Sequence, residues 1–172
     1  MALNRTPKRA LAVAYSQPVW NFEISGVYDQ ANPKFAQAPK SLADLDKPGV
    51  NIAVVSGTAI DAAVSGKLKN AQIMRLPDVD SSRLALSSKR VDLLFEDSDT
   101  NAIFAATNPE KWTVLSPKPA IAKQGIAFAV RRDATVGDLQ VLDIMIQNKL
   151  ATGEIDELGK GYIDKLAKPQ SK

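Results

Sequence analysis

The sequence predicts an α/β fold with a mostly parallel sheet, because short apolar, β-branched runs alternate along the chain with segments of helical periodicity. The clearest run, residues 50–55, is almost uninterrupted apolar sequence, which is typical of a strand buried on both faces. The clearest helical pattern, residues 135–150, has Leu139, Leu142 and Ile146 at helical spacing. Together these patterns predict helices packed against a central sheet.

The remaining elements follow from the same two periodicities. Strands are expected at residues 11–15, 23–28, 50–55, 72–76, 91–95, 112–115 and 125–130. Helices are expected at residues 41–46, 58–67, 82–89, 100–107 and 135–150, and Ile155, Leu158, Tyr162 and Leu166 indicate one more after a break at Gly153. The proline-containing segment 29–40 is expected to be a surface connection, and the tail 168–172 a frayed end.

Composition limits the classes of function. The chain has 172 residues, 45% of them hydrophobic and 24% charged, which indicates a globular protein. It has no Cys and no His, so disulfides, thiolate and imidazole catalysis and the usual zinc sites are excluded, and no metal or cofactor is expected. The net charge of +3 comes from scattered basic residues, so nucleic acid is not an expected partner.

Hydropathy along the chain bears on membranes and secretion. No apolar run approaches the roughly 20 residues of a transmembrane helix. The first residues lack the apolar stretch of about 7 to 15 residues and the cleavage site of a secretory signal, so no signal peptide is expected within this chain.

The first candidate site follows the buried strand at residues 50–55. Ser56, Gly57 and Thr58 join that strand to a predicted helix, and Gly57 permits a tight turn. Backbone N–H groups at a helix start attract anions such as a carboxylate. For these residues alone, simple capping of the helix by Ser56 or Thr58 is the favoured interpretation, since such caps are very common.

The second candidate site is the acidic end of the strand predicted at 91–95. Asp97 follows this strand, and ligands of open α/β sheets bind beyond the carboxyl ends of the strands. A carboxylate at that edge could pair with a ligand ammonium. For these residues alone, capping of the next helix by Asp97 or Asp99 is the favoured interpretation. Taken together, an anion site and a carboxylate suit a zwitterion such as an amino acid.

Five segments, in order, resemble the family 3 bacterial extracellular solute-binding proteins, the periplasmic amino-acid-binding components of ABC transporters. They cover nearly the whole chain, and each is weakly specific by itself. The segments are residues 6–10 with 14–20 (TPKRA, AYSQPVW), 42–45 with 50–58 (LADL, VNIAVVSGT), 83–97 (RLALSSKRVDLLFED), 125–132 (GIAFAVRR) and 148–162 (NKLATGEIDELGKGY).

The resemblance implies a periplasmic-binding-protein-like fold of type II, with two α/β lobes that close on a ligand. It implies that Ser56, Gly57 and Thr58 hold a ligand carboxylate and that Asp97 holds its ammonium. It also implies three parts: residues 1–27 as the remainder of lobe 1 with the first crossing strand, residues 28–119 as lobe 2, and residues 120–172 as the second crossing strand and the return to lobe 1.

The chain departs from the family in lacking the signal peptide and most of lobe 1. The resemblance therefore predicts a truncated form, a fragment or a subunit completed by another chain. Helices after residue 120 are expected to expose apolar faces, which favours self-association, including exchange of elements between copies. The expected partners are an amino-acid-like small molecule and, for a full-length protein, an ABC permease in the periplasm.

Two other functions stay open at this point. Cyclohexadienyl or arogenate dehydratases of the solute-binding type resemble the chain, but they carry an acid soon after the Gly-Thr turn, where Asp61 is the candidate here. A binding protein rather than an enzyme is the expectation. The same fold also serves as the input domain of receptors, so a sensory or interaction module is the third possibility.

Overall fold

The computed structural model describes residues 2–167, and the chain divides into two compact units. The first combines Met1–Phe22 with Lys123–Lys165, and the second contains Glu23–Ala122. The strands are β1 (Ala2–Asn4), β2 (Val13–Asp29), β3 (Asn51–Val55), β4 (Gln72–Leu76), β5 (Leu93–Asp97), β6 (Trp112–Leu115) and β7 (Lys123–Arg131). The helices are α1 (Pro7–Ala10), η1 (Pro33–Phe35), α2 (Leu42–Leu45), α3 (Ala59–Ser65), α4 (Val79–Ser87), α5 (Ser98–Ala106), α6 (Val136–Ala151) and α7 (Glu154–Ala167). The predicted frayed tail, 168–172, lies outside the described residues.

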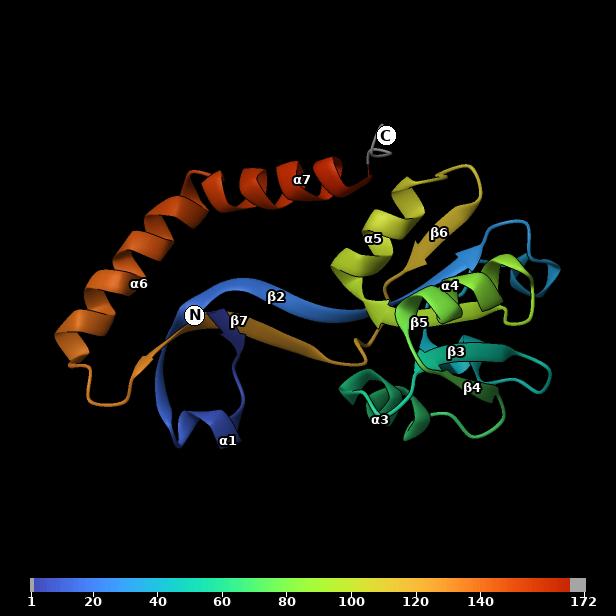
Figure 1. The fold of residues 1–172 in the computed structure, drawn as a ribbon, viewed down its shortest axis with the longest axis horizontal. Helices are drawn as coiled ribbons and strands as arrows, with labels where there is room; N and C mark the ends of the chain where they lie inside the picture. Colours follow the sequence, from blue (N-terminus) through green and yellow to red (C-terminus); the bar gives the residue numbers. More distant parts are fainter. Residues whose placement is uncertain (1, 168–172) are drawn as a thin grey trace. The chain divides into compact units, whose positions relative to one another are not determined.

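The sheet of the second unit has the order β6-β2-β5-β3-β4 (Figure 1). Strand β3 pairs in parallel with β4 and with β5, whereas β2 pairs antiparallel with β5 and β6. The predicted α/β class is confirmed, and its parallel part is the β5-β3-β4 group, which ends in the candidate site.

Strand β3 is buried on both faces, as its continuous apolar sequence predicts. Ile52 and Val54 point to one face and Ala53 to the other, and all three are fully buried. Ala53 belongs to a cluster with Leu94 and with residues of α4 and α5. Helix α3 lies across the sheet from α4 (Figure 1). The two ends of this unit are adjacent, because the Ile24 N–H donates to the Ala122 carbonyl at 3.3 Å.

The first unit contains β1, β7 and the first part of β2, in that order, with helices α6 and α7. Asp143 fixes α6 to β2: its carboxylate accepts the Gln17 N–H at 2.7 Å, and its carbonyl accepts the Gln17 side-chain amide at 2.6 Å. Ile146 is buried on the same side of α6. Gly153, with φ of +76°, separates α6 from α7, as the sequence predicts.

Strand β2 differs from the prediction of two strands at 11–15 and 23–28, because it is one strand of 17 residues. Pro18 lies within this strand, although proline donates no ladder hydrogen bond. The Pro18 ring lies beside Gly125, where an added Cβ would come within 2.7 Å of it. The absence of a side chain at Gly125 thus leaves room for the proline within the strand. Elements β1, α1 and η1 were not predicted.

Within the described residues, no helix is both long and apolar enough to cross a bilayer.

Candidate functional site

The candidate site lies at the carboxyl ends of β3 and β5. These strands are parallel neighbours, with Ile52 opposite Leu93 and Ala53 opposite Leu94. Ser56 directly follows β3 and Asp97 ends β5, so both residues lie at the carboxyl ends of neighbouring parallel strands. The fold therefore brings together the two features that the sequence singled out separately.

The turn after β3 depends on Gly57, whose φ of +73° lies in the left-handed region. The Ser56 N–H donates to the Leu76 carbonyl of β4 at 2.8 Å, which ties the turn to the next strand. Ser56 is exposed, and its hydroxyl has no hydrogen-bond partner among the described residues. This hydroxyl can donate to a ligand without losing an internal bond.

Thr58 is the N-cap of α3, which confirms the capping interpretation for this residue. Its hydroxyl accepts the Asp61 N–H at 3.1 Å and donates to the Val55 carbonyl at 2.9 Å. The hydroxyl proton is therefore already used within the turn. A ligand carboxylate could accept it only in exchange for the Val55 carbonyl.

Asp97 ends β5 and caps α5, because its Oδ1 accepts the N–H groups of Asp99 at 2.9 Å and Thr100 at 3.4 Å. Oδ2 accepts no hydrogen bond from a described residue. Burial raises the pKa of Asp97 above its ordinary value, although the two backbone hydrogen bonds act in the opposite direction. Burial likewise raises the pKa of the neighbouring Glu96. Both carboxylates are thus only partly solvated, and a nearby cation would favour their ionised forms.

Asp61 forms a network beneath the turn that the sequence did not reveal. Its carboxylate accepts the Ser65 hydroxyl at 2.7 Å, the Arg75 Nε at 3.0 Å and the Gly57 N–H at 3.2 Å. These bonds lower the pKa of Asp61, with the Ser65 hydroxyl as the largest cause, against the opposing effect of desolvation. Asp61 therefore stays ionised and occupies the Gly57 N–H, one of the donors expected to receive a ligand carboxylate.

Arg75 is the residue that sequence reasoning missed at this site. It lies on β4 opposite Val54, so its side chain points to the face that carries α3. The sequence offered two signals for this network. Side chains alternate in direction along β4, and Asp61 and Ser65 are four residues apart, so they lie on one face of α3. Their meeting depends on the pairing of β3 with β4, which one sequence does not give. Within the described part of the chain, no group of three or more His, Cys, Asp or Glu could hold a metal ion.

The fold of the chain is that of periplasmic-binding-protein-like proteins of type II. An ancestral cationic amino acid solute-binding protein aligns with a TM-score of 0.78 and 23% identity, over 94% of this chain and 66% of that one. A second structure of that ancestral protein, with a TM-score of 0.64 and 24% identity over the same shares, describes it as a precursor of cyclohexadienyl dehydratase. An amino acid ABC transporter substrate-binding protein from Streptococcus pneumoniae, bound to L-arginine, has a TM-score of 0.69 and 18% identity, over 97% of this chain and 68% of that one.

Sequence similarity points the same way. A curated protein of Campylobacter jejuni, described as a "probable histidine-binding protein", is 28% identical over 161 residues, which cover 94% of this chain and 59% of that protein. No protein-family model matches the sequence. The resemblance to amino-acid solute-binding proteins of the family 3 type is confirmed, and this chain is a relative that spans about 59% of the curated protein.

Proposed function

We propose that the chain binds a small amino acid or a similar zwitterion at the edge formed by Ser56, Gly57, Thr58 and Asp97. The observation that supports this proposal is the parallel pairing of β3 with β5, because the turn with the hydroxyl and N–H donors and the Asp97 carboxylate follow or end neighbouring strands. A zwitterion presents a carboxylate to the first group and an ammonium to the second, and so matches both.

The four residues contribute in different ways. The Ser56 hydroxyl and Asp97 Oδ2 are available for direct contact with a ligand. The Gly57 N–H and the Thr58 hydroxyl would reach the ligand carboxylate by exchanging their bonds to Asp61 and the Val55 carbonyl. A ligand carboxylate at the turn therefore competes with the Asp61 carboxylate for the Gly57 N–H. This competition limits the affinity for ligands that carry a carboxylate but no ammonium.

The similarity to transporter components supports a wider role. We infer that the protein is the solute-binding component of an ABC transporter that works in the periplasm, with a permease as its partner. The relatives that support this role include a histidine-binding protein and an arginine-bound protein. The chain spans about two thirds of the similar structures, so a truncated form of such a component, which self-associates, is part of the proposal.

The enzyme alternative depends on Asp61, and the geometry of Asp61 opposes it. A general acid must hold a proton near neutral pH. The pKa of Asp61 is lowered by its hydrogen bonds to Ser65 and Gly57 and by Arg75, so the carboxyl is ionised there. A binding protein, rather than a dehydratase, is the proposed function. The ancestral precursor of a dehydratase is itself described as an amino-acid-binding protein.

Calorimetry with histidine, lysine, arginine and glutamate tests the proposal. Saturable binding of at least one of them is expected, together with a loss of at least tenfold in affinity in Asp97→Asn, which corresponds to about 1.4 kcal/mol. Asn remains a good helix cap, so this variant removes the charge and keeps the start of α5. Asp133→Asn, at a side chain that is 74% exposed, removes one charge elsewhere and is expected to bind normally.

The possible outcomes test the proposed amino-acid binding and the role of Asp97 separately. If none of the four amino acids binds, the proposed function is wrong. If one binds equally well to Asp97→Asn, the function stands, but the assignment of Asp97 is wrong.

A further inference from the structure

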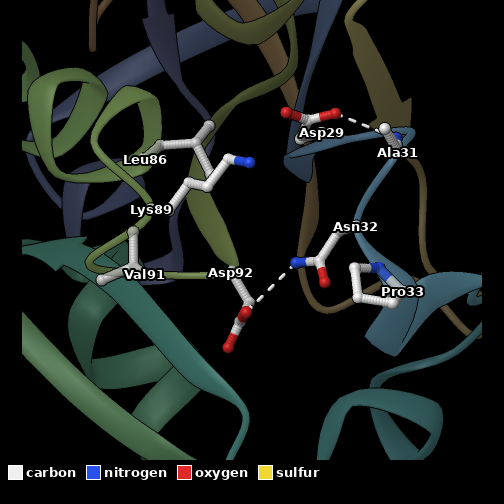
Figure 2. A pocket seen from close by; sticks show the side chains of 8 residues that line it. All are labelled: Asp29, Ala31, Asn32, Pro33, Leu86, Lys89, Val91 and Asp92. Atoms are coloured by element: carbon white, nitrogen blue, oxygen red, sulfur yellow. Dashed lines mark hydrogen bonds between the residues drawn. The ribbon is translucent and has the colours of Figure 1, made fainter.

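A cavity of about 100 Å³ lies at the start of β5, whereas Asp97 lies at the end of that strand. Figure 2 shows the side chains that line it. Val91 and Asp92, which line it, precede β5. Asp29, on its other side, ends the antiparallel strand β2, where Tyr28 pairs with Leu93. The cavity is partly open and lies between the end of β2, the end of α4 and the start of β5.

Lys89, which lines this cavity, has an unusual backbone conformation. Its φ is +59°, whereas the other residues described with positive φ are glycines. The Lys89 N–H donates to the Leu86 carbonyl at 3.0 Å and the Arg90 N–H to the Ala85 carbonyl at 2.9 Å, the two bonds of a Schellman motif at the end of α4. This position favours glycine, so local structure does not account for a lysine.

The exposed side chain of Lys89 is not used in the contacts that hold the fold together. No described residue forms an ion pair or hydrogen bond with its ammonium. Figure 2 shows the ammonium extending into the gap toward the strand end that carries Asp29. Since ammonium and carboxylate face one gap without an ion pair between them, a molecule that carries both charges can bridge them.

The other carboxylate of the cavity is already satisfied. Asp92 accepts the Asn32 amide at 3.1 Å, the Lys34 ammonium at 2.7 Å and the Asn51 N–H at 2.8 Å. The Asp29 carboxylate, in contrast, accepts only the Ala31 N–H, at 2.9 Å on Oδ1, among the described residues. Asp29 is therefore the acceptor that remains for a cationic group, and Lys89 is the matching donor.

The size and lining of the cavity select a small molecule. Leu86, Val91 and Pro33 give it an apolar wall. An apolar cavity of about 150 Å³ accommodates benzene, which has six heavy atoms. A cavity of about 100 Å³ therefore suits a molecule of fewer heavy atoms, such as glycine.

We propose that this cavity is a second binding site, which takes a glycine-sized zwitterion with its carboxylate on Lys89 and its ammonium on Asp29. The site is separate from the edge of Ser56 and Asp97, so its occupancy does not depend on the function proposed above. A purely local role for Lys89, in which it balances the negative end of the α4 dipole, is the competing explanation.

Titration of the ¹⁵N-labelled chain with glycine, followed by backbone amide spectra, tests the site. Saturable shifts are expected at Ala31, Asn32 and Val91, and these shifts are expected to be at least tenfold weaker with acetate or methylammonium alone. Asp133→Asn is expected to keep them, because this exposed residue does not line the cavity. Equal shifts with acetate alone would overturn the zwitterion assignment, and no shifts with glycine would overturn the site.

Variants of Lys89 separate ligand binding from the local role. Lys89→Gly suits the left-handed backbone, so it is expected to keep the unfolding midpoint and to lose the glycine shifts. Lys89→Gln keeps the side-chain length without its charge and is expected to lose them too. Arg90→Gln removes a charge from the same helix end, outside the cavity lining, and is expected to bind glycine normally. Glycine shifts that survive both Lys89 variants, or that disappear in Arg90→Gln, would contradict the proposal.

Discussion

Residues at the candidate edge differ in how far their polar atoms are already used within the fold. Asp97 caps α5 with one carboxylate oxygen and leaves the other without a donor. Thr58 uses both the proton and the oxygen of its hydroxyl inside the turn. Sequence alone could name these residues, because strand-to-helix junctions are visible in the pattern. It could not show which of their atoms are already engaged, since that depends on the local hydrogen bonds.

Arg75 offers a test of the network that supports the Gly57 turn. Its side chain is 49% exposed, whereas the Asp61 carboxylate that it pairs with is nearly buried. Arg75→Ala is expected to lower the free energy of unfolding by about 1 to 2 kcal/mol, because a buried carboxylate loses a charged donor but keeps Ser65 and Gly57. Urea unfolding measures the change. Lys69→Ala serves as the control at an exposed cation, and an equal loss there would argue against a specific effect of Arg75.

The pH dependence of amino-acid binding tests the charge of Asp97. Burial raises the pKa of this carboxyl, so it takes up a proton at a higher pH than an exposed Asp, whose pKa is about 3.9. A ligand ammonium favours the ionised form. Affinity is therefore expected to fall as the pH decreases through the raised pKa of Asp97, and the fall should begin above the ordinary Asp range. Calorimetry at several pH values measures it, and the same pH profile in Asp97→Asn would exclude Asp97 as the titrating group.

At the scale of elements, the prediction from sequence works best where a pattern is strong and local. Strands β4 and β6 begin and end at the expected residues, and α6 ends just before Gly153, where the helical pattern breaks. The prediction fails where a distant contact decides the structure. The continuity of β2 through Pro18 depends on the small size of Gly125, more than a hundred positions away. The pairing of Asp61 with Arg75 depends on strand order in the same way.

Helix α7 contains two glycines that should respond in opposite ways to the same change. An added Cβ at Gly159 would come within 2.6 Å of the Trp20 ring, whereas one at Gly161 would meet nothing within 4 Å. Gly159→Ala is expected to lower the free energy of unfolding by about 1 to 3 kcal/mol. Gly161→Ala is expected to raise it by about 0.5 to 1 kcal/mol, because alanine favours the helix. Thermal unfolding of both variants compares them directly, and a stabilised Gly159→Ala would contradict the packing of Trp20.

At the scale of the whole molecule, helix α6 is apolar on more than one side. Ile146 packs within its own unit, but Val141, Ile144 and Met145 lie on the other side and are 62%, 48% and 55% exposed. A helix that is apolar all round is normally covered all round. The sequence predicted exposed apolar faces after residue 120, and this exposure supports the proposal that the chain associates with a second copy.

Light scattering at micromolar concentration tests self-association. A mass above that of the monomer is expected, because burial of the stripe Val141, Ile144 and Met145 between copies removes apolar surface from water. Ile144→Glu is expected to shift the chain to the monomer, whereas Gln147→Glu, which adds the same charge beside the stripe, is expected to leave the mass unchanged. A monomer at every concentration would refute self-association, and an unchanged mass in Ile144→Glu would exclude this stripe.

The hydrogen bond between Ile24 and Ala122 has a consequence for how the chain is assembled from parts. It brings together the two ends of a stretch of about 100 positions, residues 23–122, that has its own core. A segment whose two ends meet can be inserted into a host chain through a single interruption of that host. Segment 23–122, which contains the β5-β3-β4 group, therefore has the arrangement of a domain that is inserted into another domain. The same segment could be inserted into a different host domain and keep the ends of its strands in the same arrangement.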